Sequence, residues 1–466
     1  MAETEGARTE VLERKRALME ELAKSTTISS SWPVPVTNET CSAPLRECNT
    51  KEWLISVTNG TCSAPLGECN AKELLISITN QYKNAQPLIC RAPELLCKDE
   101  KSAKFFYPEV VAIGPYHRCK ANLKLAEDHK LAAALKFTSG RCIHEFYNKV
   151  KNVTAQARAC YADKFELTDE EFACMLFFDG CFLLHFIDCC VKKKMEEFTM
   201  STHLHGFIRG DMFLLENQLP FVVLDALMSL KQVKLDDFFL SVIEKARPYE
   251  AARAPYHLLD LLRTKLLGPP NDGQQAGQGE PNLNTFRSVK ELREVGIKFR
   301  LSESHHLSDI KFHPGIVCGT LSLPKIVIDD LTRSQYLNMI ALEMCSGSAG
   351  DYGITSFAWF LDCLIDRAED VRELREKEIL INALGSDEQV AELFNEIATD
   401  LAPDYRAYVQ VLTGISDHRK AKFKVSIFRF LDTHFSSPWT AIAFFAALVL
   451  LALSVIQTIF TVYPRS

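Results

Sequence analysis

The chain is 466 residues long, carries a formal net charge of −7, and contains 47% hydrophobic and 24% charged residues. These proportions are typical of a globular protein with one added hydrophobic span. The negative balance excludes the basic footprint of a general nucleic-acid-binding protein, so no nucleic-acid partner is expected. The 16 cysteines are expected to remain thiols in a reducing compartment, behaving mostly as small buried hydrophobes.

Residues 1–86 are predicted to be a loosely ordered tether. Their first 25 residues carry charges throughout and no apolar core, so they do not form a secretory signal. A 21-residue segment that starts at Val36 is repeated from Val57. The period and the cysteine spacing leave a solenoid or a cysteine-rich module open. Only two copies are complete, which favours a tandem duplication within a tether.

A compact helical part is expected over residues 87–267. Thr168 begins its clearest helix, because three acidic residues follow it and acids stabilise the first helical turn. A polar, Gly- and Pro-rich linker, predicted to be exposed, follows at residues 268–284. Apolar residues at helical spacing predict helices at 123–137, 143–161, 169–190, 208–230, 235–246 and 257–267.

The pattern changes over residues 285–432. Alternation at 295–300, 309–313 and 321–329 predicts short strands of a small antiparallel sheet. Helices are expected at 334–345, 356–369, 371–379, 386–398 and 404–412. The predicted fold class is therefore mainly α (α+β): a helical domain with a small antiparallel sheet in its second half, followed by one C-terminal transmembrane helix.

The most distinctive internal stretch runs over residues 208–227. We expect Asp211 to cap a helix over residues 213–215, and Pro220 to end that helix or begin the next one. The polar run Glu216, Asn217 and Gln218 lies between apolar residues and is predicted to satisfy the backbone groups freed at this break. A catalytic Glu216 is the alternative.

A second candidate region is the loop at residues 108–118. Gly114 and Pro115 form a turn that places Tyr116 and His117 on this loop, and Glu127, His129 and Lys130 follow on a helix. Histidines can act as bases or ligands. No activated Ser or Cys motif accompanies them, so a structural role is favoured.

Metal and cofactor sites are not predicted. His203 with His205, and His305 with His306, lack partners at metal-ligand spacing. Asp329, Asp330 and Glu343 imitate an acidic metal cluster, although Asp330 as a cap of the following helix is the favoured interpretation. Phosphate-binding glycine motifs are missing.

The C-terminal segment, residues 438–464, is predicted to span a membrane. No charged residue occurs between Asp432 and Arg465, and the run is long enough as a helix to cross about 30 Å of hydrocarbon. Trp439 and Tyr463 lie at its ends, where amphipathic rings favour the headgroup level. The basic residues before it predict a C-terminal anchor with the bulk of the chain in the cytosol, at the plasma membrane or an endomembrane. A buried core helix is the alternative.

Two further features of the sequence bear on assembly and orientation. Small and polar residues fall on one face of the span, which favours self-association in lipid, although an unpaired helix tolerates them too. These residues are Ala443, Ala447, Leu450, Ser454, Gln457, Thr458 and Thr461. Glycosylation sequons at Asn38, Asn59 and Asn152 would be modified only in a secretory lumen.

Short motifs in a fixed order carry a family resemblance. They are residues 113–117, Glu127, His129, Lys130, residues 157–161, 179–182, 211–212, 214–221, 257–261, 296–299, Asn338, residues 341–343, Asn382, residues 385–388 and 438–439. From about Cys90 onward the chain resembles the plant family called domain of unknown function 247. The resemblance implies a C-terminal membrane helix and no assigned enzymatic activity. It also implies a link to self-incompatibility recognition, in which some grass members are implicated. The duplicated tether departs from the family pattern.

These observations predict a membrane-anchored, non-catalytic interaction or recognition module whose partners are membrane lipid and an unknown protein. The rival hypothesis is an enzyme of unrecognised class held at a membrane. A third option places the body outside the cell with its cysteines oxidised.

Overall fold

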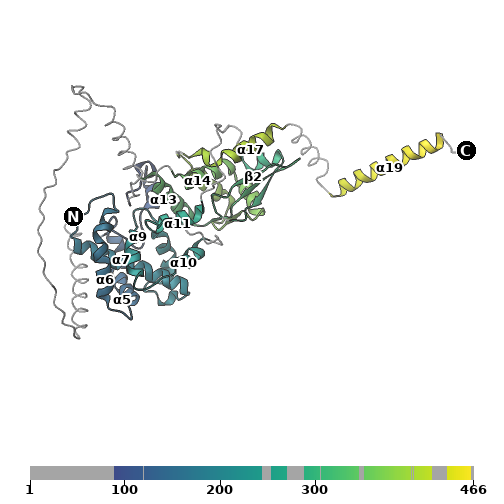
Figure 1. Ribbon diagram of the computed structural model, residues 1–466. Coiled ribbons are helices and arrows are strands. Elements are labelled where there is room, and N and C mark those ends of the chain that lie inside the picture. Colours follow the sequence, from purple (N-terminus) through teal and green to yellow (C-terminus); the bar gives the residue numbers. More distant parts are fainter. Residues whose placement is uncertain are drawn as a thin grey trace, which may run out of the picture.

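The computed structural model of the chain describes residues 89–118, 120–243, 253–269, 288–304, 306–345, 351–399, 401, 403–421 and 438–462. The predicted tether, the duplication and nearly all of the predicted linker lie outside the described residues, as does Tyr463. Figure 1 shows an elongated body with α5, α6 and α7 at one end and β2 with α17 at the other.

The first half of the body is helical. Its α-helices are α4 (Glu100–Ala103), α5 (Lys124–Phe137), α6 (Ile143–Ala159), α7 (Asp169–Lys192), α8 (His205–Asp211), α9 (Phe221–Met228), α10 (Leu235–Val242) and α11 (Leu258–Leu267). Short 3-10 helices join them at Glu94–Leu96, Lys104–Phe106, Ala121–Leu123, Met195–Glu197 and Thr202–Leu204.

The centre of this half is α7. It begins after Thr168, as the sequence predicted, and Thr168 and Glu171 form a reciprocal capping box there. The helix is apolar enough to cross a membrane, but 78% of its apolar window is buried inside the body. Helices α5, α6 and α9 pack on it, so α7 is a core helix.

The second half combines α-helices with two small sheets. Its elements are α12 (Val289–Glu294), β1 (Ile297–Leu301), β2 (Lys311–His313), β3 (Gly319–Leu323), β4 (Ile326–Ile328), α13 (Thr332–Met344), α14 (Gly353–Leu364), α15 (Ala368–Glu376), β5 (Leu380–Asn382), α16 (Asp387–Ile397), a 3-10 helix (Tyr405–Tyr408) and α17 (Val409–Lys420). Ser386 caps α16 by accepting the Gln389 N–H, at the start of the helix predicted for residues 386–398.

The expectation of an antiparallel sheet is wrong for two of the three strand pairs. Within the order β1-β3-β2, only β2 runs antiparallel to β3, across a short loop. β1 pairs with the other side of β3 and runs parallel to it. β4 pairs in parallel with β5, a strand that the sequence did not predict. The intervening helices α13–α15 supply the crossover that parallel pairing requires.

The break between α8 and α9 also differs from expectation. α8 ends at Asp211, so Asp211 does not cap a helix over residues 213–215, which form turns instead. Pro220 immediately precedes α9, whose first N–H groups need no intrahelical partner. Two successive turns therefore expose the backbone of this corner, defined here as residues 211–220, to side-chain partners.

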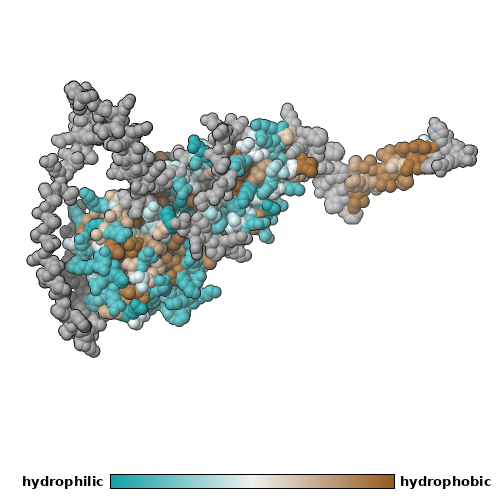
Figure 2. Space-filling view, in the orientation of Figure 1, coloured by the Kyte–Doolittle hydropathy of each residue, from teal (hydrophilic) through white to brown (hydrophobic). Residues whose placement is uncertain are grey.

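A last helix, α19 (Pro438–Val462), follows the body. Its apolar window, Ile442–Ile459, has a mean hydropathy of 2.5 and none of it is buried. Figure 2 shows this helix hydrophobic along its length, whereas the visible face of the body is largely hydrophilic. The helix is thus long and apolar enough to cross a membrane. Ala443, Ala447, Ser454 and Gln457 all lie exposed on it.

Candidate functional site

The loop at residues 108–118, with Tyr116 and His117, is held almost entirely by side chains. Its backbone makes no strand ladder, so its N–H and C=O groups need other partners. Asp211, at the end of α8, accepts the N–H groups of Glu109, Val110 and Val111 at 2.8–2.9 Å. Burial raises the pKa of Asp211 to about 6 although these three N–H groups oppose the shift. The family motif residue Asp211 is therefore an anchor of the loop.

The corner supplies two further anchors. Asn217 accepts the Ile113 N–H at 2.7 Å and donates to the carbonyls of Val111 and Asp211. Its side chain is fully buried, so these bonds replace the water that it would otherwise bind. Asn217 thus connects the loop to the corner by both donating and accepting hydrogen bonds.

Gln218 performs the same task within the corner itself. Its amide nitrogen donates to the carbonyls of Met212 and Leu214 at 2.8 Å, and its amide oxygen accepts the Leu259 N–H at 3.1 Å. These carbonyls lie at the break between α8 and α9. Gln218 therefore joins the corner to the start of α11.

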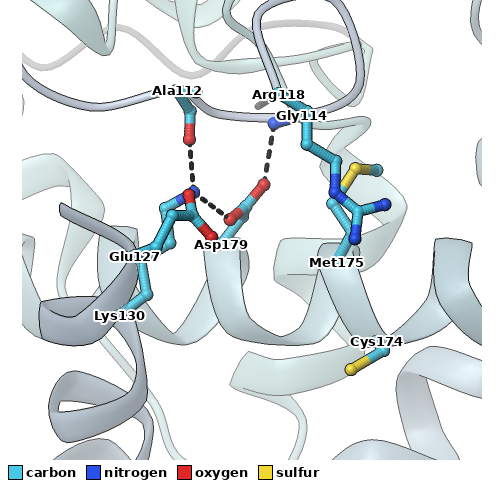
Figure 3. Close-up of a pocket in the computed structure, with 8 residues that line it drawn as sticks. All are labelled: Ala112, Gly114, Arg118, Glu127, Lys130, Cys174, Met175 and Asp179. Carbon is cyan, nitrogen blue, oxygen red and sulfur yellow. Dashed lines mark hydrogen bonds and ion pairs between the residues drawn. The ribbon is translucent and has the colours of Figure 1, made fainter. Parts of the chain in front are cut away.

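A buried ion pair holds the other side of the loop (Figure 3). Lys130 on α5 lies 2.7 Å from Asp179 on α7 and 2.5 Å from Glu127, and donates to the Ala112 carbonyl. Asp179 in turn accepts the Gly114 N–H at 2.8 Å. Burial alone would lower the pKa of Lys130, but the two carboxylates raise it. All three ammonium hydrogens have acceptors, so Lys130 has no donor left for a ligand.

Gly114 is required by both conformation and space. Its φ is 75°, a left-handed value that favours glycine. A Cβ here would lie 2.8 Å from the Gln218 carbonyl oxygen and 3.0 Å from the Tyr161 hydroxyl. Pro115 follows it, and the Tyr116 hydroxyl donates to the Ile89 carbonyl at 2.9 Å. Packing and hydrogen bonds thus fix the backbone of the family motif at residues 113–117.

The cavity beside this network is too small for a substrate. It has a volume of about 10 Å³ and is lined by Ala112, Gly114, Arg118, Glu127, Lys130, Cys174, Met175 and Asp179. A volume of this size holds about one water molecule, whereas small-molecule sites usually exceed about 300 Å³.

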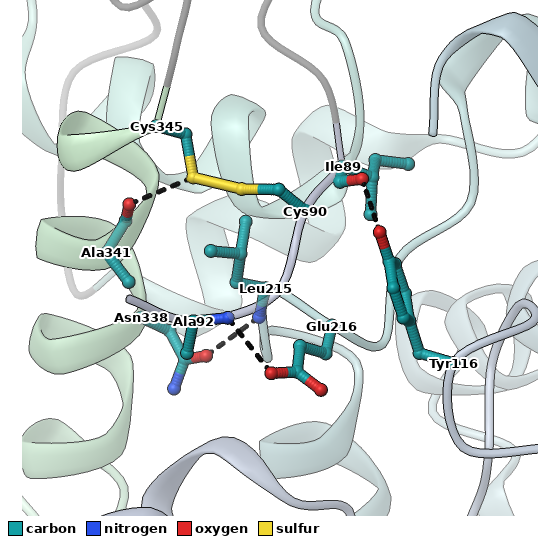
Figure 4. The surroundings of a disulfide bond; sticks show 9 residues. All are labelled: Ile89, Cys90, Ala92, Tyr116, Leu215, Glu216, Asn338, Ala341 and Cys345. Carbon is teal, nitrogen blue, oxygen red and sulfur yellow. Dashed lines mark hydrogen bonds between the residues drawn. A yellow bond between two sulfur atoms is a disulfide. The ribbon is translucent and has the colours of Figure 1, made fainter. Parts of the chain in front are cut away.

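His117 and Glu216 form the one pair in this region that resembles catalytic chemistry. Both are buried, and the His117 Nε2 atom lies 3.2 Å from Glu216 Oε2, although the two are not aligned as a hydrogen bond. The other Glu216 oxygen accepts the Ala92 N–H at 2.9 Å (Figure 4). Burial lowers the pKa of His117 despite the nearby carboxylate. The pair is a neutral imidazole beside a carboxylate, which can accept a proton.

Cys97, whose thiol is affected by the charge of Glu216, does not supply a reactive nucleophile for this pair. Burial and the negative charge of Glu216 both raise the pKa of the Cys97 thiol. Because the thiolate is the reactive form, this environment makes Cys97 less reactive than a free cysteine.

A disulfide joins Cys90 to Cys345, which are 255 residues apart in sequence (Figure 4). The expectation that the cysteines remain thiols is wrong for this pair, because the segment after Ile89 meets the end of α13. Nearby, Asn338 on α13 accepts the Leu215 N–H at 2.7 Å and donates to the Phe105 carbonyl. The disulfide and Asn338 therefore fasten the first described residues and the corner to the second half.

The remaining sequence candidates do not come together as a metal site. Within the described part of the chain, no cluster of three His, Cys, Asp or Glu residues could hold a metal ion. Glu343 is instead bound to Arg263 on α11 and accepts the N–H groups at the start of α14. Asp329, not Asp330, makes the turn before α13, because its side chain accepts from Leu331 and Thr332. His305 lies outside the described residues.

The sequence did not predict how these charged residues pair, and Arg263 was not among its candidates. Lys130 with Asp179, and Arg263 with Glu343, are paired by tertiary contact and not by sequence spacing. The available signal was Asp179 in the middle of the apolar run of α7, because a buried carboxylate requires a partner.

Comparison with known proteins shows that the sequence of this chain is similar to plant sequences. The profile of a family described as a plant protein of unknown function, domain of unknown function 247, matches residues 89–453. A UPF0481 protein of Arabidopsis thaliana is 28% identical over 397 residues, covering 76% of this chain and 82% of the relative. A putative UPF0481 protein of the same plant is 22% identical over 461 residues, covering 76% of this chain and 86% of the relative. No solved structure matches the chain.

Proposed function

Because the chain belongs to the plant family called domain of unknown function 247, we propose that it is a membrane-anchored, non-catalytic module that recognises another protein. The main support is α19, a helix of 25 residues that contains no charged residue. None of its apolar window is buried against the body. Leaving such a surface in water is costly, at about 25 cal/mol per Å² of apolar area. Lipid removes that cost.

The polar network supports a role without catalysis. Asp211, Asn217 and Gln218 make their hydrogen bonds to backbone groups, and Lys130 bonds one backbone carbonyl and two carboxylates. The cavity beside them admits about one water molecule. A catalytic residue must reach its substrate. Recognition would then use the outer surface of the body, in the self/non-self manner that the family resemblance implies.

The membrane assignment is tested by fractionation of the full-length chain from plant cells. We expect the protein to sediment with membranes and to remain there after a carbonate wash. A variant lacking residues 438–466 should move to the supernatant. Recovery of the intact protein in the supernatant would refute the anchor.

An enzyme is the second candidate, favoured by the buried pair of His117 and Glu216. The full-length protein purified in detergent should carry no bound nucleotide or metal when analysed by mass spectrometry, and cross-linking in cells should capture a protein partner. A stoichiometric cofactor, lost in Glu216→Gln and kept in Glu170→Gln at an exposed site, would favour the enzyme.

Orientation is the second part of the proposal. The last turn of α17 contains Arg419 and Lys420 on the body side of α19, which supports a cytosolic body. The disulfide between Cys90 and Cys345 favours the opposite side, because disulfides persist in oxidising compartments. We propose the cytosolic orientation, in which Cys90 and Cys345 would be reduced to thiols.

A further inference from the structure

We propose that the loop between β2 and β3, residues 314–318, is a lipid-contacting tip that lies against the membrane in which α19 is anchored. This inference rests on the proposed anchoring and adds a second site of contact between the body and the bilayer. Its partner is an anionic lipid surface.

The first observation is the exposure of Ile316. Its relative exposure is 91%, the highest among the described large hydrophobic side chains. Pro314 beside it is exposed, and Val317 is half-buried. A single exposed aliphatic side chain is common on protein surfaces. The exposure of Ile316 therefore supports a role only together with its position in the fold.

The second observation is that the tip lies where the chain leaves the body. The Phe312 ring on β2 contacts the His418 ring on α17 edge to face, with centroids 6.0 Å apart. The His418 Nε2 atom lies 3.2 Å from the Val295 carbonyl at the base of β1. The last turn of α17 and the tip therefore occupy the same end of the body (Figure 1).

The chain length between the body and α19 limits how far this end can be from the bilayer. Residues 422–437 separate α17 from α19. Fully extended, they reach no more than about 60 Å at about 3.4 Å per residue. Through these residues, the end of the body that contains the last turn of α17 is joined to α19. Figure 2 shows a hydrophobic spot at this end.

The third observation is the charge of the adjoining sheet face. Lys298 and His313 flank Thr320 in one row across the strands, and Arg300 and Lys311 flank Ser322 in the next row. All four flanking side chains are exposed. Near a membrane, lysine and arginine side chains are attracted to anionic lipid.

Acidic side chains lie beside these cations and offset part of their charge. Asp309 is held by Lys311, Ser302 and Ser304, and Asp417 lies 4.0 Å from Lys420. Glu294 at the end of α12 is exposed. An apolar residue on a protruding loop, with cations behind it, suits the interface of a bilayer.

The test uses photocrosslinking of the full-length protein in nanodiscs made with clickable anionic lipid. A diazirine side chain is placed at position 316, at position 449 within α19, or at position 125 on α5. Leu125 is also exposed, at 63%, but lies in the other half of the body. We expect lipid adducts at 316 and 449 and at most background labelling at 125.

The outcomes separate this inference from the proposed anchoring. Labelling at 449 without labelling at 316 would overturn the lipid-contacting tip and leave the anchor intact. Labelling at 316 equal to that at 125 would overturn it too, because that result reports random collision. Lack of labelling at 449 would refute the anchor, and labelling at 316 would then support the tip alone.

A charge variant adds an independent readout. In Lys298→Gln with Lys311→Gln, we expect labelling at 316 to fall at least twofold in anionic nanodiscs. The matched control is Lys151→Gln with Lys164→Gln, which lies in the helical half. Equal labelling in both double variants would show that the sheet face does not contact lipid and would overturn its part in the proposal.

Discussion

At the scale of single residues, the molecule uses buried charges to position a backbone segment. Lys130 and Asp179 are each about 2% exposed or less, and both contact the loop that carries the family motif. Taking two charges out of water is costly, so such a pair persists where both partners have further bonds. Here the further bonds go to Ala112 and Gly114.

Lys130→Met is therefore expected to destabilise the fold by about 3–5 kcal/mol, because Asp179 is left as an uncompensated buried charge. Lys151→Met is the matched control, since Lys151 forms an exposed pair with Glu170 at 3.4 Å and should cost less than about 1 kcal/mol. Thermal unfolding of the full-length protein in detergent measures both. Equal losses in the two variants would refute a positioning role for Lys130.

A buried histidine makes the stability depend on pH. His257 caps α11 by accepting the Asp260 N–H at 3.2 Å, and burial lowers its pKa to about 4. Its unfolded pKa is higher, so the unfolded chain binds more protons as the pH falls. The stability from neutral His257 is full above about pH 6.5 and is lost as the pH falls toward 4.

His257→Asn should reduce this loss, because asparagine also caps helices but does not titrate. Between pH 7 and pH 5, wild type should lose roughly 2 kcal/mol through His257, and the variant should lose that much less. Burial likewise lowers the pKa of His185 to about 4, which acts in the same direction, whereas Asp211 acts in the opposite one. Melting curves at four pH values check this. An unchanged slope in His257→Asn, with His203→Asn as the exposed control, would contradict it.

At the scale of elements, sequence patterns predicted helices well and strand partners poorly. Thr168 and Ser386 identified helix starts because capping is a local interaction. β5 was missed because its three residues follow α15 closely and their partner β4 is far away in sequence. Lys130 and Asp179 could not be paired for the same reason, since their contact depends on the packing of α5 against α7.

The C-terminal helix α19 offers a prediction at this scale. Ser454 and Gln457 lie exposed on the small and polar face of α19, and such faces favour helix contact in lipid. Ser454→Leu with Gln457→Leu should abolish cross-linked dimers of the full-length protein in membranes. The matched control is Leu451→Ala with Val455→Ala, which should keep them. Unchanged cross-linking in the first variant would count against self-association.

At the scale of the whole molecule, the two halves share one core. A single cluster of buried hydrophobic residues extends from Ile89 to Ile415. The Cys90–Cys345 disulfide and the Arg263–Glu343 pair both cross between the halves. The division at residue 267 that the sequence predicted thus marks a change of secondary structure within one core. Composition could not reveal this, because a shared core depends on which faces meet.

The proposed cytosolic orientation of the body is a property of the whole chain that glycosylation tests directly. Asn152 is exposed on α6, so its side chain can carry a glycan in a folded body. With a cytosolic body, we expect no size shift when the full-length protein is treated with a glycosidase. An acceptor tail appended after Ser466 should be glycosylated in the same chain, because the C-terminus would then lie in the lumen. A shift in the untailed protein that Asn152→Gln removes would instead place the body in the lumen, where the Cys90–Cys345 disulfide persists.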